Sequence, residues 1–579
     1  MRRAVALVLV ALAALVAQGH ASVLTSRAKA AEADRLAAQR RMAAAELFDQ
    51  REKWMHPEAP HDHDVLRDSA DDHGSNPRPP GPVEEQDSAF WMKKAKQAIE
   101  GDLLKRAEIK GVAKNVIIFM GDGMSVPTLA ATRMYLGNEN EQLSFEKFPV
   151  VGLSKTYCVD TQTADSACSA TAYLCGVKAN MGTMGVSAKV PRHNCTEQKD
   201  SANHVDSVLA WGMEAGKWAG VVTTTRITHA SPGGTYAHTA NRDWEDDKDM
   251  TDDKDLVGEG CKDIARQLVE DAPGKDFRVI MGGGRRAFIP KEQHANGKRQ
   301  DGKNLVDAWK ASKSGAQSSY VATKTELAAV DASKTDYLLG LFEWSHVQYH
   351  LDADETQPTL AEMVEKAIQV LSRQEKGYVL FVEGGRIDHG HHDTMAHYAL
   401  DETAEFSKAI QKAVDMTSAS ETLIAVTSDH AHTMSMAGYA KRSNYIFDFG
   451  GVEETSKEVY TTLSYANGPG YKPTEEDGTR HDPSKDDRNK NDYEFPATAY
   501  LNSETHGADD VGIFARGPWA HLYTGVHEQN MIPNIAAYAA AIGPFKGRSD
   551  SGDNSGAVSV QVALLTLLSA AALPLARLL

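Results

Sequence analysis

The sequence predicts an α/β protein with a mostly parallel central sheet and helices on both of its faces. The main evidence is a set of short, nearly continuous apolar runs, which are typical of strands buried on both faces. Four such runs occur, at residues 115–120, 220–225, 378–382 and 422–427. Helical patterns at residues 360–372 and 398–417 lie between them, and this alternation favours a parallel sheet.

Length and charge limit the classes of protein that the chain can belong to. Its 579 residues suffice for one large domain with insertions or for two to three ordinary domains. A net charge of −18 argues against a nucleic-acid partner, because phosphate backbones bind basic surfaces. We expect the acidic runs at residues 245–247 and 252–253 to be solvated loops.

Both ends of the chain have the composition of targeting signals. Residues 1–21 combine a basic start, an apolar run and small residues, which predicts a secretory signal peptide. Residues 549–579 combine a small, polar stretch with an apolar tail, which predicts a glycolipid-anchor signal attached at Asp553 or Asn554. An ordinary single membrane span is the alternative for this tail. Both interpretations place the protein outside the cell, and the anchor signal places it on the outer leaflet of the plasma membrane.

The cysteines and one sequon agree with an extracellular location. Disulfides persist there, and five cysteines leave at least one unpaired within the chain. The Asn-Cys-Thr sequence at residues 194–196 predicts glycosylation of Asn194 at the surface, although an unused sequon fits the same pattern.

Two segments depart from the core pattern. Residues 22–87 are poor in core-forming residues, and we expect a mobile extension with one helix. Residues 439–502 are rich in Gly, Asn, Asp, Lys and Pro, which predicts a small, loop-rich insertion.

A candidate nucleophile lies in residues 163–172. Ser166 follows the acidic Asp165 and opens a run of small residues that we expect to form a helix. The amino end of a helix attracts anions and can activate a nucleophile. Taken alone, the segment fits a capped, tightly packed core helix better than a nucleophile site, and the acidic residues and histidines in the rest of the chain reverse this preference.

Polar side chains follow each of the four predicted strands. Because the carboxyl ends of parallel strands meet at one sheet edge, we expect these side chains to share a site. They are Asp122 after the first strand, His229 and Ser231 after the second, Glu383, Asp388, His389 and His392 after the third, and Asp429, His430 and His432 after the fourth.

The spacing of these residues indicates metal chemistry. Asp388 and His392 are four residues apart, so one helical face would carry both, and His506 would complete a zinc site with an open position. Asp429 and His430, with Asp122, would hold a second zinc ion.

The oxygen ligands Asp122, Ser231 and Glu383 suit magnesium. Two zinc ions can assist an in-line displacement, with Ser166 as the attacking group and Arg242 as a bidentate clamp on the phosphoryl oxygens. Each residue alone also fits a plain structural role; their joint occurrence at strand ends favours the metal interpretation.

The chain resembles the animal alkaline phosphatases over roughly residues 90–546. The resemblance is carried by Gly-Asp-Gly-Met at 121–124, Thr-Ala-Asp-Ser at 163–166, His-Ala-Ser-Pro at 229–232, Asp-His-Gly-His-His at 388–392, Asp-His-Ala-His at 429–432 and Glu-Thr-His-Gly at 504–507. It implies hydrolysis of phosphate monoesters through a phosphoserine on Ser166, with Arg242 holding the phosphate.

The resemblance also implies a set of ligands for each metal ion. Asp388, His392 and His506 would hold the first zinc ion, Asp122, Ser166, Asp429 and His430 the second, and Asp122, Ser231 and Glu383 the magnesium ion. His229 and His389 match the animal form, and His432 would orient a ligand or the phosphate.

Further implications concern assembly and covalent links. The resemblance implies a homodimer, a crown-like insertion, a glycolipid anchor, a Cys195–Cys261 disulfide and a free, buried Cys175. Cys158 and Cys168 are additional to the family pattern, and we hypothesise that they pair. A calcium site would use Glu343 and the Phe342 carbonyl, but Gln357 stands where vertebrate members have an aspartate.

The predicted organisation follows from these assignments. It comprises a signal peptide (1–21), a mobile extension (22–87), an alkaline phosphatase core (88–438 and 503–548), a crown-like insertion (439–502) and an anchor signal (549–579).

The rival functional classes are a sulfatase or phosphodiesterase and a non-catalytic receptor. The proline and arginine that sulfatases need after the nucleophile are missing at residues 168–172, and no expected metal ligand is lost.

Overall fold

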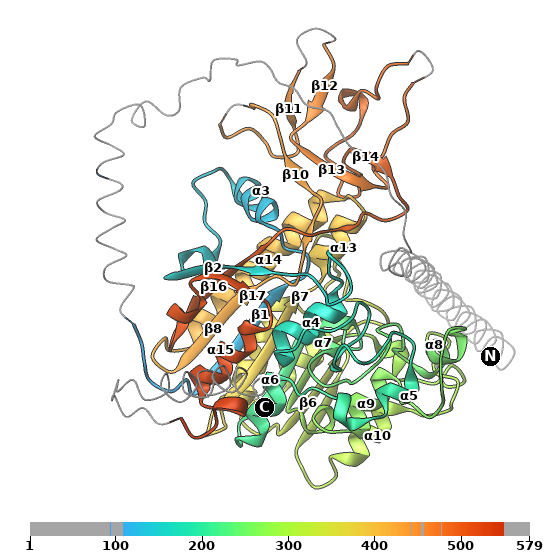
Figure 1. Ribbon diagram of the computed structural model, residues 1–579, viewed down its shortest axis with the longest axis vertical. Coiled ribbons are helices and arrows are strands. Elements are labelled where there is room, and N and C mark those ends of the chain that lie inside the picture. The colour runs from blue at the N-terminus through green and yellow to red at the C-terminus, as the bar shows by residue number, and fades with distance from the viewer. Residues whose placement is uncertain (1–92, 94–107, 441, 453–456, 476–477, 549–579) are drawn as a thin grey trace, which may run out of the picture.

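The computed structural model describes residues 93, 108–440, 442–452, 457–475 and 478–548. Its central feature is a ten-stranded sheet (Figure 1). In spatial order the strands are β17 (Gly525–Glu528), β2 (Val150–Lys155), β16 (Val511–Arg516), β8 (Thr422–Thr427), β1 (Asn115–Gly121), β7 (Tyr378–Gly384), β3 (Trp218–Arg226), β4 (Val279–Gly283), β6 (Tyr337–Leu341) and β5 (Ser318–Val321). Only β16 runs antiparallel to its neighbours, so the predicted fold class is confirmed.

Strand β1 shows why helices cover both faces of the sheet. Successive side chains of a strand point to opposite faces, so an apolar run needs packing partners on each side. Ile117 and Phe119 join one buried apolar cluster, whereas Val116 and Ile118 join another. An unbroken apolar run in the sequence therefore becomes a strand buried between two cores.

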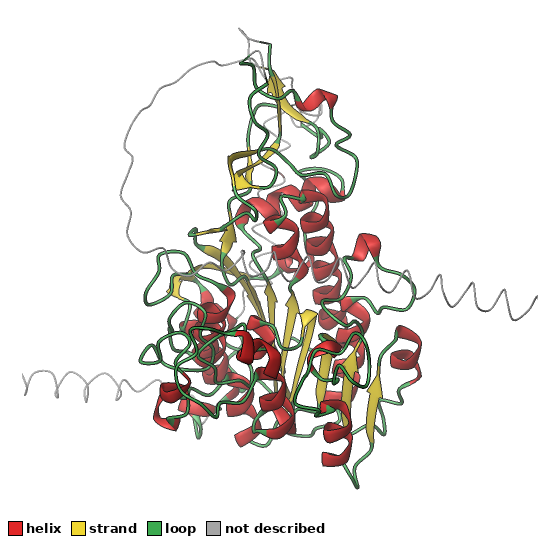
Figure 2. Cartoon of the chain, turned by 90° about the vertical axis from the view of Figure 1, so that its right-hand side faces the viewer, coloured by secondary structure: helices red, strands yellow, loops and turns green. Residues whose placement is uncertain are grey.

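The helices form a layer on each side of the strands (Figures 1 and 2). The Phe119 side is covered by α12 (Leu360–Leu371) and α14 (Ala396–Met416), which agree with the predicted helices at 360–372 and 398–417. The opposite side is covered by α4 (Ser166–Cys175), α6 (Val208–Glu214), α9 (Ile264–Glu270), α10 (Leu305–Ser312) and α15 (Met531–Ala540). Within the described residues, the other α-helices are α3 (Val126–Leu136), α5 (Cys195–Gln198), α7 (Ala230–Gly233), α8 (Asp247–Asp252), α11 (Lys324–Ala329) and α13 (Arg386–His392).

Small sheets lie beyond one end of the central sheet (Figure 1). Strands β10 (Ser435–Met436), β13 (Leu463–Gly468) and β14 (Ala497–Tyr500) form one of them, and β11 (Phe449–Val452) pairs with β12 (Val459–Thr461). A third cluster of buried residues, including Phe447, Leu463 and Phe495, packs this region against Leu400 of α14. Strands β11 to β14 fall within the predicted insertion at residues 439–502, whereas β10 precedes residue 439. The bounds of the insertion stay a prediction.

The prediction that residues 245–247 form a solvated loop was wrong. Glu245 and Asp246 are buried. The Arg226 guanidinium donates to both Glu245 oxygens, and the Asp246 side chain caps the first turn of α8. Composition alone could not reveal that a buried arginine from β3 would neutralise this acidic run.

The disulfide predictions are confirmed. Cys195 pairs with Cys261, Cys158 pairs with Cys168, and Cys175 is a free, buried thiol. The sequon side chain of Asn194 is partly exposed and caps α5 through its carbonyl oxygen. Its glycosylation stays a prediction.

Several predicted segments lie outside the described residues. These are the signal peptide, the whole extension at residues 22–87 and the anchor signal with Asp553 and Asn554. Among the residues that are described, none of the helices has the length and apolar character needed to cross a membrane.

A buried carboxyl group on α14 makes stability depend on pH. Glu402 is 5% exposed and accepts a hydrogen bond of 2.8 Å from the His350 backbone N–H. Burial raises the pKa of Glu402 to about 7, from an ordinary value of 4.5. Because the folded state holds this proton more tightly than the unfolded state, Glu402 lowers stability progressively as pH rises from 4.5 through 7.

We therefore expect Glu402→Gln to stabilise the protein relative to wild type at pH 8 but not at pH 4.5. The difference in unfolding free energy between the variant and wild type should change by on the order of 3 kcal/mol between pH 4.5 and pH 8. Urea unfolding of both proteins at the two pH values measures it. The exposed Glu355→Gln is the matched control and should show no such pH dependence. An equal effect of Glu402→Gln at both pH values would contradict the assignment.

Candidate active site

Four neighbouring strands bring the predicted site residues together. The order β8-β1-β7-β3 places their carboxyl ends side by side, as the sequence predicts. The residues that follow or end these strands are Asp429, His430 and His432 (β8), Asp122 (β1), Glu383, Asp388, His389 and His392 (β7), and His229 and Ser231 (β3). All of them are buried.

The first group of ligand atoms surrounds Asp388. His392 lies one helical turn further along α13, and its Nε2 is 3.3 Å from Asp388 Oδ1. His506, in the short strand β15 (His506–Gly507), places its Nε2 3.4 Å from the same oxygen and 3.0 Å from His392 Nε2. Three ligand atoms thus converge from two elements, as the spacing of Asp388 and His392 predicts.

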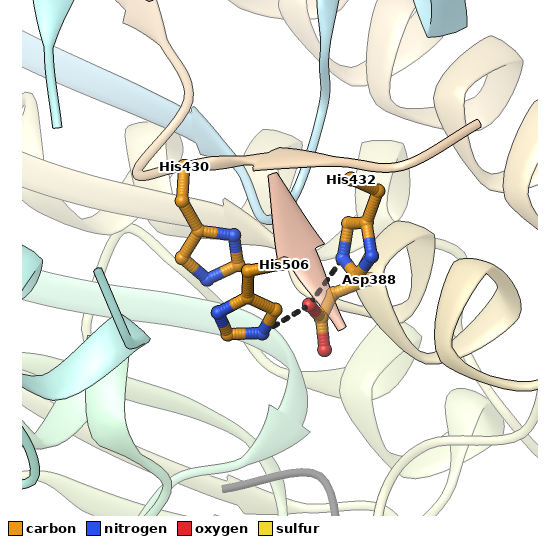
Figure 3. Close-up of side chains that lie close together, drawn as sticks. All are labelled: Asp388, His430, His432 and His506. Carbon is orange, nitrogen blue, oxygen red and sulfur yellow. Dashed lines mark hydrogen bonds and ion pairs between the residues drawn. The ribbon is translucent and has the colours of Figure 1, made fainter. Parts of the chain in front are cut away.

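A fourth side chain, His432, also contacts Asp388 (Figure 3). Its Nε2 lies 2.7 Å from Asp388 Oδ1, and its Nδ1 bonds the Glu504 carboxylate. Burial acts to lower the pKa of His432, but the two carboxylates raise it to about 10. His432 therefore links Asp388 to Glu504. Sequence reasoning missed Glu504, although it lies two residues before His506 in the same motif.

The second group lies at the end of β8. His430 Nε2 is 3.1 Å from Asp429 Oδ2 and 3.5 Å from Asp122 Oδ1. The Ser166 hydroxyl lies 3.1 Å from the same nitrogen. The carboxylates and imidazole predicted for a second metal ion therefore meet at the candidate nucleophile.

The third group contains Asp122, His229 and Glu383, whose ligand atoms lie within 4.8 Å of one another. Thr223 and Thr225, on β3, donate hydrogen bonds to Glu383 Oε2. This leaves Glu383 Oε1 for another ligand. The two threonines were not predicted, because only the pairing of β3 with β7 brings them to Glu383.

Unsatisfied buried atoms show that these groups fit cations. Both Asp122 oxygens, Asp429 Oδ2, Glu383 Oε1 and the Ser231 hydroxyl are buried without a hydrogen-bond partner. Burial and the neighbouring Asp429 carboxylate raise the pKa of Asp122 well above its ordinary value. A buried carboxylate with no donor is costly unless it is protonated or bound to a cation. Oxygen and imidazole donors in such clusters are ordinary ligands for divalent metals.

Asp165 anchors α4, the helix that begins with the candidate nucleophile Ser166. Its Oδ1 accepts hydrogen bonds from the backbone N–H groups of Cys168 (3.1 Å) and Gly182 (3.0 Å). Its Oδ2 pairs with Arg242 Nη1 at 3.0 Å. Asp165 therefore sets the amino end of α4 and holds Arg242 beside Ser166.

Comparison with known proteins agrees with this geometry. The family model described as alkaline phosphatase matches residues 113–542. The chain is 47% identical to the membrane-bound alkaline phosphatase of Bombyx mori over 508 residues, which cover 84% of this chain and 90% of the relative.

The chain belongs to the alkaline phosphatase family. It is a phosphoric monoester hydrolase.

Other relatives support the assignment. The tissue-nonspecific alkaline phosphatase of Mus musculus is 45% identical over 509 residues, with 84% of this chain and 96% of the relative covered. Among solved structures, the enzyme from the Antarctic bacterium TAB5 matches with a TM-score of 0.53 at 22% identity, covering 75% of this chain and 99% of that one. The Thermus thermophilus enzyme gives the same TM-score and identity, covering 76% of this chain and 94% of that one. These two structures share the fold.

The alkaline phosphatase site contains a further histidine that the sequence did not reveal. The His346 ring lies 4.4 Å from the His389 ring and 5.3 Å from the His229 ring, centroid to centroid. Arg226 contacts both nitrogens of His346, and it also pairs with Glu245. His346 comes from the loop after β6, and only tertiary contacts could identify it.

The buried ligand groups predict a measurable response to metal. Adding divalent zinc and magnesium to chelator-treated alkaline phosphatase should raise its melting temperature. At a metal concentration of 100 times the dissociation constant, one bound ion contributes about 2.7 kcal/mol. Asp122→Asn should reduce the shift, because Asp122 belongs to two ligand groups.

Thermal unfolding followed by circular dichroism measures this shift without requiring activity. Asp415→Asn, an exposed carboxylate on α14, is the control and should leave the shift intact. Equal shifts in the Asp122→Asn and Asp415→Asn variants would contradict the placement of Asp122.

Proposed function

We propose that Ser166 is the nucleophile of this alkaline phosphatase and carries a phosphoserine intermediate. The observation that carries the proposal is the position of the Ser166 hydroxyl, at the amino end of α4 and 3.1 Å from His430 in the second ligand group. The helix end supplies a positive electrostatic potential for an anionic substrate.

In the proposed reaction, Ser166 Oγ forms a bond to the phosphorus atom of a phosphate monoester as the bond to the alcohol oxygen breaks, and the alcohol leaves with the proton that Ser166 has lost. Water then attacks the phosphoserine, which releases phosphate and restores Ser166. Arg242 holds two of the phosphoryl oxygens through its guanidinium group, and Asp165 keeps that group oriented by their 3.0 Å ion pair.

We propose two zinc sites and one magnesium site. Asp388, His392 and His506 hold the first zinc ion, Asp122, Ser166, Asp429 and His430 the second, and Asp122, Ser231 and Glu383 the magnesium ion. When bound, the zinc ions supply charge stabilisation for the attacking and leaving oxygens. The magnesium assignment is supported by the three oxygen donors, although the His229 imidazole belongs to the same group as Asp122 and Glu383. It is also supported by a TAB5 alkaline phosphatase variant whose structure has magnesium bound in its M3 site.

His229, His389 and His432 are proposed to orient ligands and phosphate. Arg242 Nη2 contacts His229 Nε2 at 3.3 Å, and Arg386 Nη1 contacts His389 Nδ1 at 2.9 Å. His432 contacts Asp388 directly. His229 thus contacts the phosphate clamp and His432 contacts the first ligand group, while His389 Nε2 lies 4.0 Å from Asp388 Oδ2.

The calcium site expected from vertebrate members is not part of this proposal. Glu343 Oε1 accepts a hydrogen bond from the Trp344 backbone N–H, and Glu343 Oε2 accepts one from the Gln357 side-chain amide, both at 2.7 Å. Gln357 thus directs a donor at Glu343 where a cation would need another oxygen. The residues present do not fit calcium.

We also propose a glycolipid-anchored homodimer on the extracellular face of the plasma membrane. The anchor signal at residues 549–579 and the family resemblance support it, as does the name of the Bombyx mori relative, which describes a membrane-bound enzyme. Small phosphate monoesters are the proposed substrates.

The test of the metal assignment is hydrolysis of a chromogenic phosphate monoester at alkaline pH. Activity should disappear after chelation and return only when zinc and magnesium are added together. Full activity after complete chelation, verified by metal analysis, would contradict the proposed site.

Removal of the nucleophile has its own expected outcome. Ser166→Ala should lower kcat by at least about 1000-fold, because alanine lacks the attacking oxygen. Steady-state kinetics on the metal-loaded variant measures the loss. Ser169→Ala is the matched control: Ser169 is buried on the same helix, but its hydroxyl bonds the Asp165 carbonyl. A Ser166→Ala variant as active as Ser169→Ala would contradict the assignment of Ser166 as the nucleophile.

A further inference from the structure

A disulfide lies beside the proposed nucleophile. Cys168 is two residues after Ser166 on α4, and it pairs with Cys158, ten residues earlier. Both cysteines are 2% exposed and pack with Ala164, Ala179 and Met181. The bond closes a covalent ring from residue 158 to residue 168. We call this ring the nucleophile loop.

The nucleophile loop contacts three parts of the active site. The Ala164 carbonyl accepts a hydrogen bond of 2.7 Å from His506 Nδ1 and so orients the other ring nitrogen toward Asp388. Asp165 holds Arg242, and Ser166 faces His430. A ligand of the first group, the phosphate clamp and the nucleophile thus all depend on consecutive residues within the ring.

Non-covalent bonds hold the outer side of the loop to residues 178–182. The Val159 backbone N–H donates to the Ala179 carbonyl at 3.0 Å, and the Met181 backbone N–H donates to Asp160 at 2.9 Å. Cys168 lies one helical turn from the capping carboxylate of Asp165, which accepts from its backbone N–H. The disulfide therefore ties the start of the nucleophile loop to the first turn of α4.

We propose that the Cys158–Cys168 disulfide is a positioning element for the phosphoryl-transfer reaction. It limits the movement of residues 164–166. The Ala164 carbonyl thereby stays hydrogen-bonded to His506, and Asp165 stays paired with Arg242. The Ser166 hydroxyl likewise stays beside His430. This inference rests on Ser166 being the nucleophile. It goes further by assigning a role in turnover to two cysteines that belong to none of the three proposed metal sites.

A positioning role and a purely stabilising role have different consequences. A disulfide that only stabilises the fold should affect the melting temperature and leave turnover and metal retention intact. A positioning disulfide should also change kcat, because groups that orient metal ligands and nucleophiles affect activity or metal affinity by 10–100-fold when they are lost.

The test is the double variant Cys158→Ala/Cys168→Ala, in which alanines preserve the apolar surroundings. Both cysteines are replaced so that neither can pair with Cys175. The matched control is Cys195→Ala/Cys261→Ala, which removes the other disulfide. Both variants and the wild type are loaded with zinc and magnesium, and kcat, KM, melting temperature and the rate of zinc release to a chelator are measured.

We expect Cys158→Ala/Cys168→Ala to lower kcat at least about tenfold and to release zinc at least about tenfold faster than wild type. The control should lower the melting temperature while its kcat and zinc release stay within about twofold of wild type. A Cys158→Ala/Cys168→Ala variant with wild-type kcat and zinc release would overturn the inference. An inactive wild type, by contrast, would indicate failure of the proposed function.

A second measurement covers the case in which the double variant does not fold. The Cys195→Ala/Cys261→Ala protein is treated with a water-soluble phosphine, which reduces a disulfide to two thiols and becomes the phosphine oxide with oxygen from water. Alkylation and mass spectrometry give the fraction of Cys158–Cys168 that is reduced at each time. Activity should fall in proportion to this fraction; constant activity at complete reduction would overturn the inference.

Discussion

The burial of several carboxylates that lack hydrogen-bond donors is the constraint on which the rest of the site depends. Asp122, Glu383, Asp388 and Asp429 are all buried at one edge of the sheet. Burial and the nearby Asp429 raise the pKa of Asp122, and oxygens of Asp122, Glu383 and Asp429 lack hydrogen-bond donors. Such an arrangement is costly without cations. Bound cations would remove this cost, and the cluster therefore favours metal binding.

The central sheet accounts for how so many charged groups meet in a buried place. Adjacent parallel strands β8, β1, β7 and β3 end at the same edge, and two apolar cores hold them from both faces. Neighbouring side chains and backbone groups fix the orientation of the candidate metal ligands through hydrogen bonds. Glu504 holds His432, the two threonines of β3 hold Glu383, and the Ala164 carbonyl holds His506. The nucleophile loop extends this support to Ser166.

The sequence predicts the fold class and the ligand groups because both follow from local patterns. Apolar runs define the strands, and polar residues directly after them must meet where the strands end. The resemblance to alkaline phosphatases then assigns individual roles, such as the phosphate clamp at Arg242. What the sequence cannot reveal depends on tertiary contacts: Arg226 buries the acidic run at Glu245, and His346 reaches the site from a distant loop.

The central claim is that Ser166 forms a covalent bond to phosphate during turnover. The most direct measurement is a rapid acid quench of the metal-loaded enzyme with a phosphate monoester, followed by proteolysis and phosphopeptide mapping by mass spectrometry. The account predicts phosphate on Ser166 within the peptide that spans the start of α4. Phosphate on a different residue, or an unmodified enzyme during demonstrated turnover, would contradict it.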